Sequence, residues 1–280
     1  SLISVMEERE RSGYVSDKKY TGYKRQPVFT KEMKKRYTIL APQMAPYHFD
    51  LIEAAFRYSG FDFVVLKDYS KKIVDTGLKY VNNDACYPSI LTVGQLMNAL
   101  ESGKYDLSRT ALLITQTGGA CRATNYISMI KKALADGGYS DTPLLSLNFN
   151  GFEKQPGFKI TPGLAVRAFM GLIYGDAICR CLYRVRPYEI EKGSANRLYE
   201  KWNEYLKKDL EHISFKRYRQ NLKRMVQEFA DLPVYDIEKP RVGVVGEILV
   251  KYSPAANNDV VGFLESEGAE AVVPDLMGFI

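Results

Sequence analysis

Two of the four cysteines, Cys86 and Cys121, lie in loop-forming sequence where a thiolate could do chemistry. Cys86 follows the polar residues 82–84, and Cys121 lies in the glycine-rich stretch 117–125. A predicted helix begins after each, and a helix N-terminus offers unpaired amides and a positive dipole end that stabilise a thiolate. Soft thiolates select iron–sulfur clusters, zinc or copper. Burial as structural cysteines is the alternative for this pair.

The glycine-rich loop fits a cluster better than a nucleotide. Gly118 and Gly119 allow close approach of the backbone and can donate N–H groups to cluster sulfides. The loop lacks the lysine of a GxxxxGK[ST] motif, and no GxGxxG turn follows the first predicted strand. The binding of a small molecule by a Rossmann-type fold is therefore the least favoured of the functions considered for this chain.

The remaining candidates are given structural roles. Cys179 and Cys181 are two residues apart in a helical run, so they point in different directions and are predicted to pack in the core. The chain has two histidines, which argues against a histidine-based zinc site. Tyr47 and His48 follow the first predicted strand, and we interpret both as residues at a helix start or on the surface.

Apolar runs alternate with helical patterns through the first half of the chain. Strands are predicted at 37–42, 61–66, 78–84, 110–116 and 142–149, with helices at 46–60, 69–77, 89–103 and 126–138. This order predicts a doubly wound, mostly parallel α/β sheet of Rossmann or flavodoxin type. Cys86 would follow the third strand and Cys121 the fourth, so both would lie on the same rim of the sheet.

The pattern changes after residue 160. Two or three helices are predicted over 162–232, followed by a strand at 240–247, a helix at 257–268 and a strand at 269–274. The predicted divisions are a basic tail or linker (1–36), an α/β domain (37–161), a helical connector (162–236) and the start of a second α/β domain (237–280). Two strands and one helix cannot bury their own core, so we expect a truncated chain or a partner, with a homodimer as one possibility.

Charge and hydropathy narrow the classes of partner. Residues 1–36 hold ten Lys or Arg against five Asp or Glu, which accounts for most of the net charge of +6. Because the rest is nearly neutral, nucleic-acid binding is not favoured. No apolar stretch is long enough to span a membrane, and no signal peptide is recognisable, so a soluble, cytoplasmic protein is expected.

Several strings resemble one family. The chain from 37 to 280, with DACYP (84–88), QTGGACRATNY (116–126) and GEILVKYSPAANND (246–259), is similar to the C-terminal region of the large proteins related to 2-hydroxyacyl-CoA dehydratase activators. These proteins are also called CoA-substrate-specific enzyme activases, and the region is similar to the cluster-binding subunits of the dehydratases themselves.

The resemblance implies an oxygen-sensitive four-iron, four-sulfur (4Fe-4S) cluster that handles ATP-driven, low-potential electrons. Cys86 and Cys121 match two of its three cysteine ligands, with the third expected beyond Ile280, so this fragment would bind the cluster incompletely or not at all. Gly118, Gly119 and Arg122 would shape the pocket. The implied partners are the ATP-binding activase modules of the same long chain and a dehydratase or other electron acceptor. The alternative is a non-enzymatic docking region of that long protein.

Overall fold

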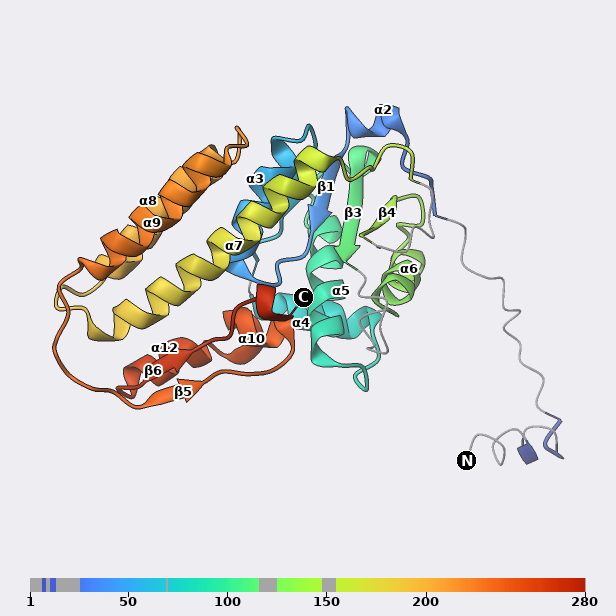
Figure 1. The fold of residues 1–280 in the computed structure, drawn as a ribbon. Helices are drawn as coiled ribbons and strands as arrows, with labels where there is room; N and C mark the ends of the chain where they lie inside the picture. The colour runs from blue at the N-terminus through green and yellow to red at the C-terminus, as the bar shows by residue number, and fades with distance from the viewer. Residues whose placement is uncertain are drawn as a thin grey trace.

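A computed structural model describes residues 7–8, 11–13, 26–68, 70–115, 125–147 and 155–279. Within these residues, a parallel sheet in the first half has the strand order β2-β1-β3-β4 (Figure 1). Its strands are β1 (Thr38–Ala41), β2 (Asp62–Val65), β3 (Thr110–Thr115) and β4 (Leu144–Leu147). Ile39 of β1 is opposite Phe63 on one side and Ala111 on the other. The predicted doubly wound α/β fold is confirmed.

Helices cover both faces of the sheet. They are α2 (Lys31–Lys34), α3 (Pro46–Arg57), α4 (Lys71–Tyr80), α5 (Tyr87–Glu101) and α6 (Tyr126–Asp136), with the 3₁₀ turn η1 (Leu107–Arg109). Because side chains alternate along a strand, Leu40 and Leu112 share a core with α5 and α6, whereas Ile39 and Leu113 share one with α3. Burial on both faces explains why the strands are continuous apolar runs in the sequence.

The prediction of a strand at 78–84 is wrong, because helix α4 continues into it. The predicted helix end at Gly77 is instead the point where α4 touches α5. A Cβ on Gly77 would lie 2.2 Å from the carbonyl oxygen of Ile90, and one on Gly94 would lie 2.1 Å from that of Ile73. The two glycines let the helix backbones approach each other, so tertiary packing outweighs the low helix propensity of glycine.

The residues just before the sheet belong to the folded core. Phe29 is fully buried in the same core as Ile39, although the sequence analysis placed it in a linker. Its N–H donates to Oε1 of Gln155 at 2.7 Å, and its carbonyl accepts from the N–H of Gly157 at 2.9 Å. The predicted tail of 1–36 therefore extends too far, and most of residues 1–25 lie outside the described part of the chain.

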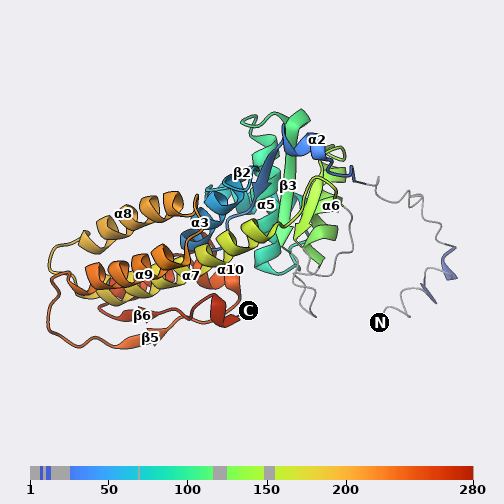
Figure 2. The same ribbon diagram turned by 45° about the horizontal axis from the view of Figure 1, so that its top comes forward.

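Three helices follow the sheet in the described part of the chain, as the sequence predicted for 162–232. They are α7 (Pro162–Val185), α8 (Ser194–Asp209) and α9 (Phe215–Ala230), with a 3₁₀ turn, η3 (Arg186–Tyr188), after α7. Figure 2 shows α7 reaching from the sheet to the opposite end of the molecule. The three helices share an apolar core that contains Tyr174, Trp202 and Phe229, each at most 1 % exposed.

The C-terminal unit, residues 237–279, packs on α7. Its elements are β5 (Arg241–Gly243), α10 (Ile248–Tyr252), α11 (Pro254–Asn257), α12 (Val260–Ser266), β6 (Glu270–Val272) and η4 (Met277–Phe279). Strands β5 and β6 pair in parallel, and Val244, Val261 and Ala271 join the core of α7. The expectation that this unit cannot bury a core alone agrees with the structure, in which α7 completes that core.

Ion pairs also join the C-terminal unit to the end of α7. They are Arg180–Asp275, Arg184–Glu270 and Arg186–Glu265. The last is the least exposed: Nε and Nη2 of Arg186 donate to both carboxylate oxygens of Glu265 at 2.8 and 2.9 Å. Pairs on the surface contribute little, whereas this two-bond pair fixes the direction in which α12 meets α7.

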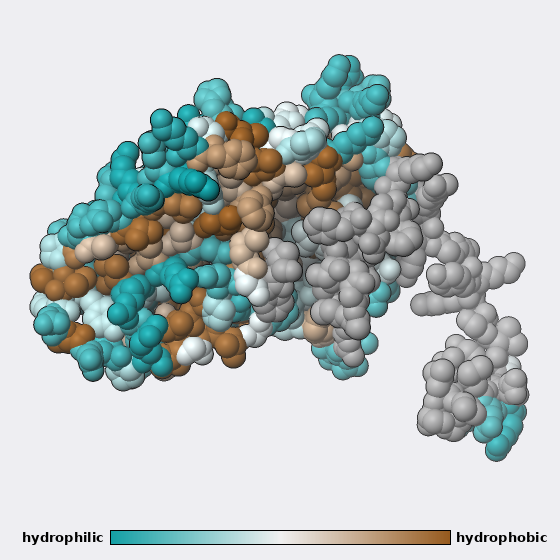
Figure 3. All heavy atoms as spheres, in the orientation of Figure 1, coloured by the Kyte–Doolittle hydropathy of each residue, from teal (hydrophilic) through white to brown (hydrophobic). Residues whose placement is uncertain are grey.

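The visible surface has a mixed character. In Figure 3, hydrophilic side chains dominate over α8, and hydrophobic ones gather along α7. Phe169 of α7 is 53 % exposed.

Within the described residues, no helix combines the length and the apolar character that crossing a membrane requires.

Candidate functional site

Cys86 lies at the start of α5, as the N-cap residue in an extended conformation. Pro88 occupies the first turn, where its missing N–H costs nothing, and the first turn holds no acidic residue. The Cys86 side chain is half-buried, and its Sγ lies 3.9 Å from the hydroxyl of Tyr126. The helix start that the sequence predicted is confirmed, although α4 and a turn precede Cys86 in place of a strand.

The other predicted site residues lie outside the described part of the chain. Cys121, Gly118, Gly119 and Arg122 all fall between Thr115, where β3 ends, and residue 125. Tyr126, the first residue of α6, contacts Cys86, so the start of α6 lies beside the thiol. That Cys86 and Cys121 come together remains a prediction.

The cysteines of α7 have the structural role that the sequence predicted. Cys179 is 5 % exposed in the core of α7 to α9, and Cys181 packs against the same core. Burial raises the pKa of the Cys181 thiol to about 11 and raises that of Cys179 well above its ordinary value. Cys86 packs against the separate core of α5 and α6, so the α7 pair does not extend its site.

These differences predict an order of thiol reactivity. In the native protein at mildly alkaline pH, Cys86 should react with iodoacetamide first, Cys181 more slowly and Cys179 only on unfolding, because the thiolate is the reactive form. Peptide mapping by mass spectrometry over time measures the order. Equal labelling of Cys86 and Cys179 would contradict the burial described here.

His48 is fully buried in the first turn of α3, so its interpretation as a surface residue is wrong, although it does lie at a helix start. Its Nε2 lies 2.8 Å from Oδ1 of Asp176 on α7. Asp176 also accepts the backbone N–H groups of Leu276 and Met277 at 2.6 and 2.9 Å. The sequence analysis missed Asp176, although a lone acid in an apolar helical run was an available signal.

The His48–Asp176 pair joins three segments of the chain. Burial alone would raise the pKa of Asp176, but the hydrogen bonds from His48 and the two amides outweigh it and hold that pKa below its ordinary value. Asp176 is therefore ionised, and Nε2 of His48 carries the donated proton. Nδ1 of His48 is buried without a hydrogen-bond partner among the described residues. The pair ties α3, α7 and the C-terminal segment together.

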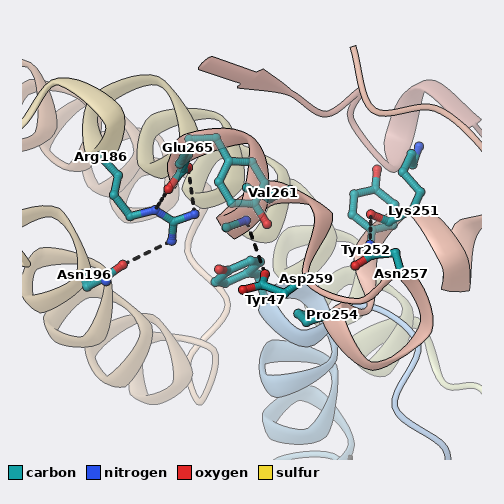
Figure 4. A pocket seen from close by; sticks show the side chains of 12 residues that line it. Tyr47, Arg186, Asn196, Lys251, Tyr252, Pro254, Asn257, Asp259, Val261 and Glu265 are labelled. Carbon is teal, nitrogen blue, oxygen red and sulfur yellow. Dashed lines mark hydrogen bonds and ion pairs between the residues drawn. The ribbon is translucent and has the colours of Figure 1, made fainter. Parts of the chain in front are cut away.

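A cavity of about 280 Å³ lies between the C-terminal unit and the ends of α3 and α7 (Figure 4). Tyr47, which lies at the start of α3 as one of the two sequence interpretations had it, lines this cavity, and burial raises the pKa of its hydroxyl. Figure 4 shows Arg186 between Glu265 and Asn196, whose Oδ1 accepts from Nη1 at 3.2 Å. Because Glu265 already neutralises Arg186, this end of the cavity offers no free charge to a ligand.

A smaller cavity of about 190 Å³ lies beside α5, between α4 and the short helix α11 with its flanking residues. Tyr87, the neighbour of Cys86, lines it together with Gln95. The Gln95 side chain donates to the carbonyl of Gln43 at 3.1 Å and accepts its N–H at 2.7 Å. The C-terminal unit therefore covers the part of the sheet rim next to the helix that carries Cys86.

The described residues provide one ligand position that suits a metal cluster. Among them, no group of three or more His, Cys, Asp or Glu side chains is placed to hold a metal ion. Cys86 itself fits as a ligand: its thiol is half-exposed, has a hydroxyl beside it and lies at a helix N-terminus without an opposing acid in the first turn.

No protein-family model, curated protein or solved structure matches this chain. The family relationship suggested by the motifs therefore stays a prediction. Any assignment of function must be argued from the position and surroundings of Cys86.

Proposed function

We propose that this chain is part of an iron–sulfur redox protein of the 2-hydroxyacyl-CoA dehydratase and activator system, in a reducing cytoplasm. Cys86 and Cys121 are two ligands of a 4Fe-4S cluster, and Gly118, Gly119 and Arg122 shape its pocket. A third cysteine, expected C-terminal to residue 280, completes the ligand set.

The observation that carries this proposal is the position of Cys86. Its Sγ is 3.9 Å from the hydroxyl of Tyr126, the first residue after the glycine-rich loop that contains Cys121. Cys121 precedes Tyr126 by five positions in the sequence, and this spacing supports a cluster that Cys86 and Cys121 share.

The protein's own residues would hold and tune such a centre. Cys86 is the N-cap residue of α5, and the positive end of a helix dipole favours an anionic sulfur ligand at that position. The Tyr126 hydroxyl is placed to donate a hydrogen bond to that sulfur, and hydrogen bonds to sulfur shift the reduction potential of iron–sulfur clusters. The cluster, when bound, supplies one-electron chemistry at low potential.

The sequence contains no GxxxxGK[ST] phosphate loop, and in this proposal the driving energy comes from another module. ATP-binding activase modules would deliver the electron, and a dehydratase or another acceptor would receive it. In this series of electron transfers, the chain described here is the part that carries the cluster.

Anaerobic reconstitution tests the proposal. The natural polypeptide containing residues 1–280 is incubated with iron and sulfide, and iron per chain and the visible spectrum are measured. Wild type should take up iron and absorb broadly in the visible, whereas Cys86→Ser and Cys121→Ser should each lose most of the iron. Cys181→Ser is the matched control, because it removes a half-buried thiol from a different core and should retain the cluster.

A colourless wild type, or equal iron uptake by all three variants, would overturn the cluster assignment. The second candidate, a docking region without enzymatic activity, would then take its place. Exposed apolar side chains on the C-terminal unit favour that candidate: Val245 is 78 % exposed and Phe263 is 60 % exposed.

A further inference from the structure

Helix α9 has one side in the core and one side in solvent, and Figure 2 shows it beside α7, away from the sheet. The buried side carries Asn221, Met225 and Phe229. At 3.6 residues per turn, six exposed residues share one sector of about 100° that begins next to the buried side: Phe215, Val226, Arg219, Ala230, Lys223 and Lys216. We call these residues the outer face of α9.

The outer face is basic and carries no acidic residue. Helix α9 holds five basic residues and one acidic residue. Arg217 and Arg224 lie off the outer face, and each pairs with an acidic residue of α8 or α9. Lys216, Arg219 and Lys223 form no ion pair with any residue that the structure describes. Among the described residues, nothing neutralises the positive charge of this face.

The same face exposes apolar side chains. Phe215 is 64 % exposed and Val226 is 49 % exposed. They lie 11 positions apart, which separates them by about 16 Å along the helix axis. Large apolar groups at both ends of a basic row are typical of an interaction surface rather than of a solvated helix.

We propose that the outer face of α9 docks an acidic amphipathic helix of a partner protein. The partner's carboxylates would pair with Lys216, Arg219 and Lys223, and its apolar residues would cover Phe215 and Val226. Helix recognition uses apolar anchors along one side of a helix, and Phe215 and Val226 lie on one side of α9 about three turns apart. The charges would set the association rate and the orientation, and the apolar contacts would supply most of the affinity. This proposal does not depend on the iron–sulfur function.

A broad anionic surface fits less well than a helix. The neighbouring helix α8 exposes Glu200 and Glu204 together with Lys201 and Lys208, so its surface is of mixed charge. A lipid headgroup layer or a nucleic-acid backbone favours a larger and uniformly basic surface. Nucleic-acid binding also draws on more phosphate contacts than three cations on one helix can make.

A binding experiment tests the proposal with the whole 280-residue chain. The probe is a fluorescent synthetic helix of Leu and Glu heptads, and binding is followed by anisotropy. Wild type should bind it, and added salt should weaken the binding. The triple variant Lys216→Gln, Arg219→Gln, Lys223→Gln should bind about tenfold more weakly, and so should the double variant Phe215→Ser, Val226→Ser.

The matched control removes the same charge elsewhere, through Lys104→Gln, Lys159→Gln and Lys192→Gln, which are exposed residues on other segments. This control should bind like wild type, and circular dichroism confirms that every variant is folded. The proposal is overturned if wild type does not bind the probe, or if the control triple variant loses as much affinity as the triple variant of the outer face. It is also overturned if anionic vesicles or single-stranded RNA bind this face more tightly than the peptide does.

Discussion

Replacing Asp176 with alanine is expected to lower the free energy of unfolding by about 3–5 kcal/mol, as when one partner of a buried charged pair is removed. Three donors lose their acceptor together: Nε2 of His48 and the N–H groups of Leu276 and Met277. His48 is 0 % exposed, so its imidazole cannot turn to water. Unpaired buried donors carry their full desolvation cost.

Urea denaturation of wild type and of Asp176→Ala measures this loss in the free energy of unfolding. Asp275→Ala is the control, because its pair with Arg180 is on the surface and should contribute less than about 1 kcal/mol. Asp176→Asn keeps one carbonyl acceptor, so its loss of stability should lie between those of Asp275→Ala and Asp176→Ala. A loss for Asp176→Ala no larger than that of Asp275→Ala would show that the pair does not hold the C-terminal segment.

Acidification provides a second measurement of the same pair. The pKa of Asp176 in the folded protein lies below its ordinary value of 3.8 because its hydrogen bonds outweigh its burial. The folded state therefore binds its proton less readily than the unfolded state does. The stabilising contribution of Asp176 is present above the pKa that this carboxyl has in the unfolded state. It disappears as the pH falls through the lower pKa of the folded state. Asp176→Ala should lose less stability than wild type on acidification below about pH 4.

Replacing Gly94 with alanine is expected to destabilise the protein by about 2–3 kcal/mol, even though alanine is about 1 kcal/mol better in a helix. The new Cβ would lie 2.1 Å from the carbonyl oxygen of Ile73 and 3.0 Å from the backbone nitrogen of Gly77. Both are backbone atoms of α4, so no side chain can move aside. Helices α4 and α5 must separate, which would also shift Cys86 at the start of α5.

Gly163 offers the matched control for this prediction. It is also helical, but a Cβ there would meet a side-chain atom, Nη1 of Arg167 at 3.1 Å, as its nearest neighbour rather than backbone. Gly163→Ala should be neutral or slightly stabilising in the same urea denaturation experiment. If Gly94→Ala unfolded at the same urea concentration as Gly163→Ala, the close approach of α4 and α5 would be refuted.

Local patterns in the sequence were enough to predict most of the fold. The apolar runs around Ile39, Phe63, Leu112 and Leu145 predicted buried parallel strands, and the helical spacing over 162–232 predicted the helices that became α7, α8 and α9. Cys86 was predicted at a helix start from its own neighbours, above all Pro88. These features depend on residues a few positions apart, which is the range over which strand and helix periods act.

Features that join distant residues could not be predicted in this way. Gly77 was taken for a helix end, because its contact with Ile90 appears only when α4 and α5 pack together. His48 was interpreted as a helix-start or surface residue, and its burial was missed because its partner Asp176 lies 128 positions away.

The sequence by itself therefore determined the α/β fold class, the helix start at Cys86 and the core role of Cys179. Only the tertiary structure decided which polar groups are buried as pairs, which glycines are contact points and which cations of α9 form no ion pair among the described residues. The physical reason is that local periodicity follows from the geometry of one helix or strand, whereas burial, pairing and close packing depend on which elements meet in space.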